Sequence, residues 1–354
     1  MNLIRDWFQR NFSDPQAMFL ALLLVGGFVL IIFWGNMLAP LLASMVIAYL
    51  LEAVVTLLES KSLPRLVAVV IVFLAFVVVL LFLILWLIPV LSAQVAQLVQ
   101  ELPRQIDHGQ QMLMRLPQQY PQFVSEDQVK EIMSTIRSEI GVLGQSLLSF
   151  SLSSIPGLIA LVVYLILVPL MVFFFLKDKR LILDWVAAYL PQQRGLANRV
   201  WQEMDQQIGN YVRGKFMEIL IVGFTSYIVF LLMGLNYAML LGALVGLSVV
   251  VPYIGAAVVT IPVALIAFFQ WGWGSEFAYL MLAYGVIQAL DGNVLVPLLF
   301  SEAVNLHPIA IIIAVLVFGG LWGFWGVFFA IPLATLVKAV LSAWPRKVES
   351  ASSA

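Results

Sequence analysis

The chain of 354 residues has no cysteine and few charged residues. The absence of cysteine excludes disulfide scaffolds, thiolate metal sites and cysteine nucleophiles. Charged residues make up only 10 % of the chain and the net charge is −1, so there is no global basic field of the kind that binds nucleic acid. Hydrophobic residues make up 63 %, well above the roughly 45–50 % of soluble domains. The composition therefore predicts an all-α integral membrane protein.

Long apolar runs cover most of the chain, and each is long enough to cross about 30 Å of hydrocarbon. They predict a polytopic helical bundle of about eight spans. The third run is expected to tilt or kink near Pro89 because it is longer than one span requires. The eight runs are residues 17–35, 37–58, 66–91, 152–176, 216–233, 237–269, 277–300 and 308–341.

Polar segments between these runs divide the chain into regions. A helical extramembrane domain is expected between the third and fourth spans, with a capping box at Ser125 and Gln128 and breaks at Pro103, Pro117 and Pro121. The predicted regions are spans one to three (1–91), a periplasmic helical domain (92–150), span four (151–176), a cytoplasmic amphipathic segment (177–215), a C-terminal membrane transport region (216–344) and a cytoplasmic tail (345–354).

The amphipathic segment carries apolar residues four positions apart, which indicates a helix with one apolar face. Two interpretations are open: the helix lies along the membrane interface, or it packs on a neighbouring helix. The spaced residues are Leu196, Val200, Met204, Ile208 and Val212.

Basic residues orient the chain, because cytoplasmic loops are enriched in Lys and Arg. With a cytoplasmic N-terminus and eight spans, the cytoplasmic side collects Arg5, Arg10, Lys61, Arg65, seven basic residues of 177–215, Arg346 and Lys347. The other side has four basic residues, all in one long loop with six acids. Both termini are therefore expected in the cytoplasm.

Two of the eight runs are too long for one simple helix and contain helix-breaking residues. Broken or re-entrant helices at corresponding places in two halves are typical of transporter binding sites. The alternative is that the glycines only allow close helix packing. The breaking residues are Pro252, Gly255 and Pro262 in the first run, and Gly319, Gly320, Gly323, Gly326 and Pro332 in the second.

From Phe216 to Val337 there is no Lys or Arg, yet this stretch contains four acids, and Asp291 lies in an otherwise uncharged sequence. An ionised carboxylate inside a bilayer costs roughly 2.5–3.5 kcal/mol, so it normally faces a pathway. With Gln288 and Asn293, Asp291 is predicted to coordinate a cation or to hydrogen-bond a hydroxylated solute. The alternative is an acid in a vestibule, or a protonated acid that caps a break at Gly292 and Asn293.

Other polar residues support fewer functions. His307, with Glu302 and Asn305, either relays protons or caps the next helix. With two histidines and no suitable spacing, no metal site is predicted. A phosphate-loop-like sequence at Gly209–Lys215 is followed by Phe216 where Ser or Thr is needed, so no nucleotide or other cofactor is expected.

Charged residues at the predicted cytoplasmic ends of spans have simpler roles. Arg213 and Lys215 are predicted to anchor the fifth span at the anionic cytoplasmic surface. Glu52, inside the second span, is expected to reach Lys61 or Arg65. No hydrolase motif occurs in the sequence, so an enzyme is not predicted.

Ordered blocks along nearly the whole chain resemble the autoinducer-2 exporter family. The resemblance is weakest between Ser92 and Phe150. It is carried by Val168–Lys179, Asn210–Lys215, Val251–Gly255, Asp291–Pro297, Leu306–Pro308 and Ala330–Ala334.

The resemblance implies a bacterial inner-membrane permease that is homo-oligomeric, with a five-membered ring as one candidate arrangement. The family is named for export of a small polar signalling molecule, and some relatives act as sodium or proton antiporters. Family positions that are usually acidic or Asn correspond to Asp291 and Asn293. Many relatives carry the longer Glu where this chain has Asp291.

Three hypotheses follow. The first is a secondary transporter that exports a small polar solute, such as autoinducer-2, by alternating access. The second is a sodium or potassium/proton antiporter in which Asp291 exchanges a proton for a cation. The third is an accessory or scaffold protein whose 92–150 domain recruits a partner. The expected partners are the lipid bilayer, a small polar solute and/or a monovalent cation or proton, and no nucleic acid.

Overall fold

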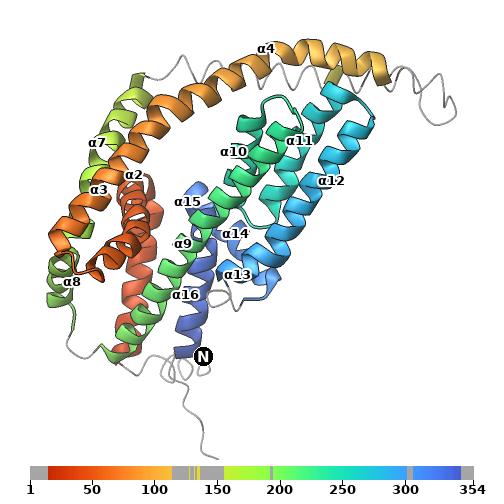
Figure 1. The fold of residues 1–354 in the computed structure, drawn as a ribbon. Helices are drawn as coiled ribbons and strands as arrows, with labels where there is room; N and C mark the ends of the chain where they lie inside the picture. The colour runs from red at the N-terminus through yellow and green to blue at the C-terminus, as the bar shows by residue number, and fades with distance from the viewer. Residues whose placement is uncertain are drawn as a thin grey trace, which may run out of the picture. The chain divides into compact units, whose positions relative to one another are not determined.

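Every regular element that the computed structural model describes is a helix (Figure 1), which confirms the predicted all-α class. The described residues are 15–113, 127, 131, 134, 135, 155–191, 194–300 and 306–343. The predicted capping box at Ser125 and Gln128, and the breaks at Pro117 and Pro121, lie outside them. The chain divides into two compact units. Unit 1 contains residues 1–73, 167–215 and 300–354, and unit 2 contains residues 74–166 and 216–299.

Five described helical segments are long and apolar enough to cross a membrane, and several shorter apolar helices accompany them. Large apolar side chains are exposed on them, for example Leu232 at 80 % and Leu298 at 72 %. A bilayer solvates such side chains, whereas water does not. The long segments are Met37–Glu59, Arg65–Glu101, Gly195–Leu232, Ile254–Trp271 and Ser275–Phe300.

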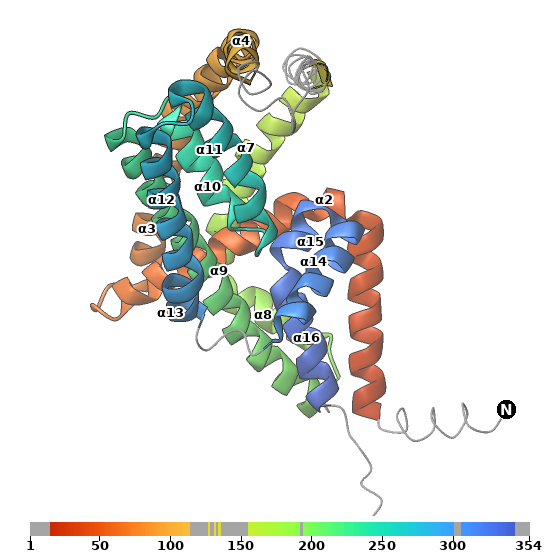
Figure 2. The same cartoon turned by 90° about the vertical axis from the view of Figure 1, so that its right-hand side faces the viewer.

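In unit 1 the first two predicted spans form one helix of 45 residues, α2 (Pro15–Glu59). Figure 2 shows that α2 changes direction between its red N-terminal part and its orange-red C-terminal part. Pro40 lies inside the helix, where it supplies no backbone N–H, and prolines are a common cause of such bends. The hydroxyl of Ser44 donates to the Pro40 carbonyl at 2.6 Å.

The third predicted span is longer than expected. It begins with α3 (Arg65–Phe82), passes through a π-helical turn, η1 (Leu83–Leu87), and continues as α4 (Ile88–Leu113). The turn ends two residues before Pro89, whose ring would otherwise clash with the carbonyl four residues earlier. The predicted irregularity near Pro89 is therefore present, as a π-turn.

The predicted helix break at Pro103 is wrong, because α4 continues to Leu113. A proline inside a helix removes one backbone donor at a cost of about 3 kcal/mol. The other hydrogen bonds of the 26-residue helix α4 maintain it on both sides of that position. The predicted boundary at residue 92 is thus not a helix end.

The amphipathic segment forms α8 (Lys179–Ala188), which follows α7 (Ile155–Lys177), and the first part of α9 (Gly195–Leu232). Val200 and Met204 of α9 are buried against Leu20 of α2, and Leu336 and Val340 of α16 (Ala330–Ala343) pack against the same cluster. Burying such side chains contributes about 1.5–3 kcal/mol each. For this part of α9, packing on neighbouring helices is confirmed.

Unit 2 is built around the first broken run, which forms α10 (Ala238–Ser248) and α11 (Ile254–Trp271). They lie side by side with α12 (Ser275–Leu290), as Figure 1 shows. After α12 the chain forms a second π-helical turn, η2 (Asp291–Leu295), and α13 (Val296–Phe300). The core residues of this unit include Phe230, Leu241, Val245, Val263, Leu280 and Tyr284.

The second broken run lies in unit 1 and forms three helices: α14 (Pro308–Trp322), α15 (Phe324–Phe328) and α16. α14 packs against both α15 and α16. With 15 and 14 residues, α14 and α16 are each shorter than the roughly 20 residues that a membrane span requires. The prediction of two broken helical elements in the C-terminal half is confirmed.

Candidate functional site

Asp291 begins the π-helical turn η2 between α12 and α13. The backbone N–H of Val296 donates to the Asp291 carbonyl, a bond that spans five residues instead of four. Such turns occur mostly as single insertions in α-helices and frequently at functional sites. The predicted helix break at Gly292 and Asn293 is therefore a π-turn, with helical backbone on both sides.

The polar neighbours of Asp291 in sequence lie on the same stretch of helix. Gln288 is half-buried, three residues before the half-buried Asp291. Asn293 is exposed, and its side-chain N–H donates to the Ala289 carbonyl at 2.8 Å. That bond uses a donor of Asn293 and leaves its side-chain oxygen as an acceptor. The structure thus places a carboxylate and two amides within six residues of one apolar helix.

Three further residues were predicted to belong to the pathway. Glu302 and Asn305 lie outside the described residues. His307 is exposed, and its Nδ1 accepts a hydrogen bond from the Ile309 backbone N–H at 3.2 Å. The imidazole therefore caps α14, which confirms the capping interpretation. A proton relay through His307 stays a prediction.

The predicted hinge residues mark the breaks in the two runs. Pro252 lies between α10 and α11, and Pro262 lies inside α11. A Cβ at Gly255 would lie 1.7 Å from the Ser248 carbonyl oxygen, so only glycine allows this approach of the two helices. The first break is thus a tight corner at the start of α11.

The second run breaks at Gly323, whose φ of +58° disfavours other residues. A Cβ at Gly326 would lie 1.8 Å from the Phe318 carbonyl oxygen, and one at Gly319 would lie 2.8 Å from Val327. Gly320 has open space around it, and Pro332 lies near the start of α16. Close packing and helix breaking therefore occur together in this run.

The two predicted anchors lie in different environments. Arg213 is exposed and donates to the Asn210 side-chain oxygen at 2.7 Å. Lys215 is only 4 % exposed, and its Nζ lies 5.2 Å from the centre of the Phe300 ring. The hydroxyl of the buried Tyr211 donates to the Phe328 carbonyl at 2.9 Å. Anchoring at the surface stays a prediction, and of the pair only Arg213 is exposed for it.

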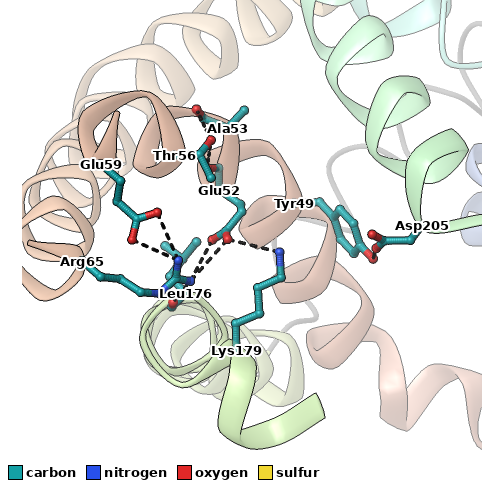
Figure 3. A network of polar contacts seen from close by, with 9 residues as sticks. All are labelled: Tyr49, Glu52, Ala53, Thr56, Glu59, Arg65, Leu176, Lys179 and Asp205. Atoms are coloured by element: carbon teal, nitrogen blue, oxygen red, sulfur yellow. Dashed lines mark hydrogen bonds and ion pairs between the residues drawn. The ribbon is translucent and has the colours of Figure 1, made fainter. Parts of the chain in front are cut away.

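Unit 1 also contains a network of charged side chains, most of which the sequence did not predict (Figure 3). Arg65 lies 3.3 Å from the carboxylates of both Glu52 and Glu59, and it donates to the Leu176 carbonyl at 2.8 Å. Lys179 lies 3.1 Å from Glu52. The predicted pairing of Glu52 with Arg65 is confirmed, and the network joins α2 to α3, α7 and α8.

A cavity of about 190 Å³ lies next to this network, within unit 1. Its polar lining comes from Tyr49, Glu52, Lys179 and Asp205, and the rest is largely apolar. The Tyr49 hydroxyl donates to the Asp205 carboxylate, as Figure 3 shows. No short-range pattern signals this site, because Lys179 is 127 residues from Glu52 and Asp205 is 156 residues from Tyr49.

Comparisons with known proteins agree in describing relatives that transport. The sequence model of the protein family described as AI-2E family transporter matches residues 18–346 of this chain. The chain is 50 % identical over 345 residues to PerM of Escherichia coli (strain K12), which is named as a permease, and covers 98 % of both chains. It is 28 % identical to the transport protein YueF of Bacillus subtilis (strain 168), covering 87 % of this chain and 84 % of YueF. The transport protein YrrI of the same organism is 27 % identical, with 85 % of each chain covered.

Proposed function

The chain belongs to the AI-2E family of transporters, and from this premise we propose that it is a secondary transporter that exports a small polar solute by alternating access. The family and the membrane helices make it a multi-pass membrane transport protein. The solute class, the direction and the mechanism are our proposal. So are the bacterial inner-membrane location, the cytoplasmic termini and the homo-oligomeric ring.

The observation that carries this proposal is the position of Asp291 at the start of a π-helical turn in an apolar membrane helix. A carboxylate at such a position is costly unless it has a role in a pathway or a polar interior. The extra residue of the turn changes the direction of side chains after it relative to those before it. Asp291, Asn293 and Gln288 then supply acceptors and donors for the hydroxyl groups of a polar solute.

Alternating access also requires backbone positions at which helices change direction. Both broken runs supply them, at residues 249–253 between α10 and α11 and at Gly323 between α14 and α15. In this proposal the short helices rearrange about these corners. The tight approach at Gly255 and Gly326 supports discrete packing arrangements, because a packed interface does not deform continuously.

The test is transport of labelled autoinducer-2 by the purified protein in liposomes. Asp291→Asn keeps the size of the side chain and removes its charge, so it should lower the initial rate at least about tenfold. Glu276→Gln is the matched control, because Glu276 is an exposed acid in the first turn of α12, the helix that directly precedes Asp291. Its rate should stay within about twofold of the parent. Equal rates for the parent and Asp291→Asn, with both proteins eluting as one species, would contradict the proposal.

A sodium or potassium/proton antiporter is the second candidate, because carboxylate and amide oxygens are also ligands for small cations. The same liposomes, loaded with a pH dye, distinguish the two candidates. A pulse of sodium or potassium, but not choline, should change the internal pH of an antiporter, and Asp291→Asn should abolish that change. A pH trace that is silent for all three cations rules the antiporter out and leaves solute export.

A further inference from the structure

The cavity in unit 1 has a lining of mixed charge. Glu52 and Asp205 supply two carboxylates, and Lys179 supplies one ammonium group. The Lys179 ammonium lies 3.1 Å from Glu52, and its side chain is 43 % exposed, so further donors remain for a ligand. A ligand that carries only negative charge meets a net negative lining. A zwitterion with a phosphate and a primary ammonium matches both signs.

The rest of the cavity wall is apolar and includes Met45 of α2, Phe175 of α7 and Ile182 of α8. A volume of about 190 Å³ is well above the roughly 10–15 Å³ that a single water molecule needs. This is room for a phospholipid headgroup together with the start of one acyl chain. The combination of charged and apolar walls therefore suits an amphiphile better than a fully polar solute.

One wall of the cavity, α8, has the character of a helix at a membrane interface. It exposes Leu181 at 72 % and Trp185 at 63 %, and Tyr189 directly after it is 75 % exposed. The rings of Trp185 and Tyr189 lie 5.2 Å apart. Trp and Tyr are enriched at the level of lipid headgroups, and short amphipathic helices lie in that plane. The cavity therefore lies beside a helix that is suited to the depth of phospholipid headgroups.

We propose that this cavity is a binding site for phosphatidylethanolamine. The phosphate is held by Lys179, the ammonium group by Asp205 and Glu52, and the start of one acyl chain by the apolar wall. The pairing of Tyr49 with Asp205 and of Arg65 with Glu52 holds the two carboxylates in place. The proposal is independent of the direction of transport and of the role of Asp291.

The test is native mass spectrometry of the purified protein with added phosphatidylethanolamine or phosphatidylglycerol. We expect the parent to retain phosphatidylethanolamine at least about fivefold better, because the net negative lining repels phosphatidylglycerol. Lys179→Gln should lower retention of both lipids at least about fivefold, because both carry the phosphate that Lys179 holds. Arg180→Gln is the matched control, since Arg180 is the next residue, is exposed and does not line the cavity. Equal retention of both lipids by the parent, or equal effects of the two variants, would show annular lipid only.

A second variant tests the cavity without changing its charge. Ala48→Met should fill the space beside α2, because Ala48 is 8 % exposed and lines the cavity. Ala48→Met should lower retention of phosphatidylethanolamine relative to Arg180→Gln, which again serves as the control. Glycerophosphoethanolamine, which has the headgroup but no acyl chains, should not compete. Full competition by this headgroup would overturn the lipid assignment in favour of a soluble zwitterion.

Discussion

Replacing Gly255 by alanine is predicted to destabilise the protein strongly. The added Cβ would lie 1.7 Å from the Ser248 carbonyl oxygen and 2.6 Å from the carbonyl carbon. Ordinary contacts begin at 3.4 Å, so the oxygen or α11 would have to move by about 1.7 Å. Because the contact is with backbone, no change of side-chain rotamer relieves it, and the corner between α10 and α11 must open.

The magnitude follows from two opposing effects. Overpacking usually costs about 1–3 kcal/mol, and a clash with backbone belongs at or above the upper end. Alanine is favoured over glycine inside a helix by about 1 kcal/mol, which offsets part of that cost. The expected net loss is therefore about 2 kcal/mol or more. Gly285→Ala in α12 is the matched control, because a Cβ there meets nothing within 4 Å, and it should gain up to about 1 kcal/mol.

Thermal unfolding in detergent, followed by size-exclusion chromatography with fluorescence detection, measures the difference. A gap of about 3 kcal/mol between the two alanine variants corresponds to roughly 6–12 °C in Tm, on a scale of about 2–4 °C per kcal/mol. Equal Tm values for Gly255→Ala and Gly285→Ala would refute the reasoning, since the close approach would then not exist in the protein.

Three further substitutions test hydrogen bonds that shape the two units. Gln94→Ala removes the side-chain oxygen that accepts from the Leu240 backbone N–H, in the first turn of α10, at 2.9 Å. This change should lower the free energy of unfolding by about 1 kcal/mol, whereas Gln97→Ala on the exposed face of α4 should cost little. Tyr211→Phe removes the hydroxyl that donates to the Phe328 carbonyl of α15 at 2.9 Å, and it should lower the free energy of unfolding by about 1–2 kcal/mol. Tyr189→Phe, at an exposed position, should leave it unchanged. Arg65→Lys keeps the positive charge but loses the guanidinium group that donates to Glu59, Glu52 and the Leu176 carbonyl, so the Tm should fall. An unchanged Tm would argue against the network.

Patterns along the chain were sufficient to predict the fold class and the helix breaks in the two long apolar runs. Apolar runs longer than one helix, interrupted by Pro252 or by Gly323, predict breaks because these residues restrict or strain a helical backbone. The structure confirms helix ends close to both residues. The position of Asp291 in an apolar helix is likewise a property of local sequence, and so is the capping of α14 by His307.

Helix ends and π-turns were less predictable. Local sequence suggested a break at Pro103, but α4 continues through it, because a long helix tolerates the loss of one donor. The second part of the amphipathic segment and the fifth predicted span are one helix, α9, although its composition changes sharply near Phe216. A helix ends where its hydrogen bonds and packing end, and polarity alone does not decide this.

By itself, the sequence determined that the chain is a helical membrane protein, that its C-terminal half contains two broken helical elements, and that an acid lies in an apolar helix. It could do so because composition and local periodicity are properties of neighbouring residues. Only the tertiary structure decided which distant side chains meet. Lys179 and Glu52 are 127 residues apart in the chain and 3.1 Å apart in space, and the cavity beside them exists because α2, α7, α8 and α9 pack together. Such contacts depend on how whole helices pack against one another, and no short stretch of sequence encodes that packing.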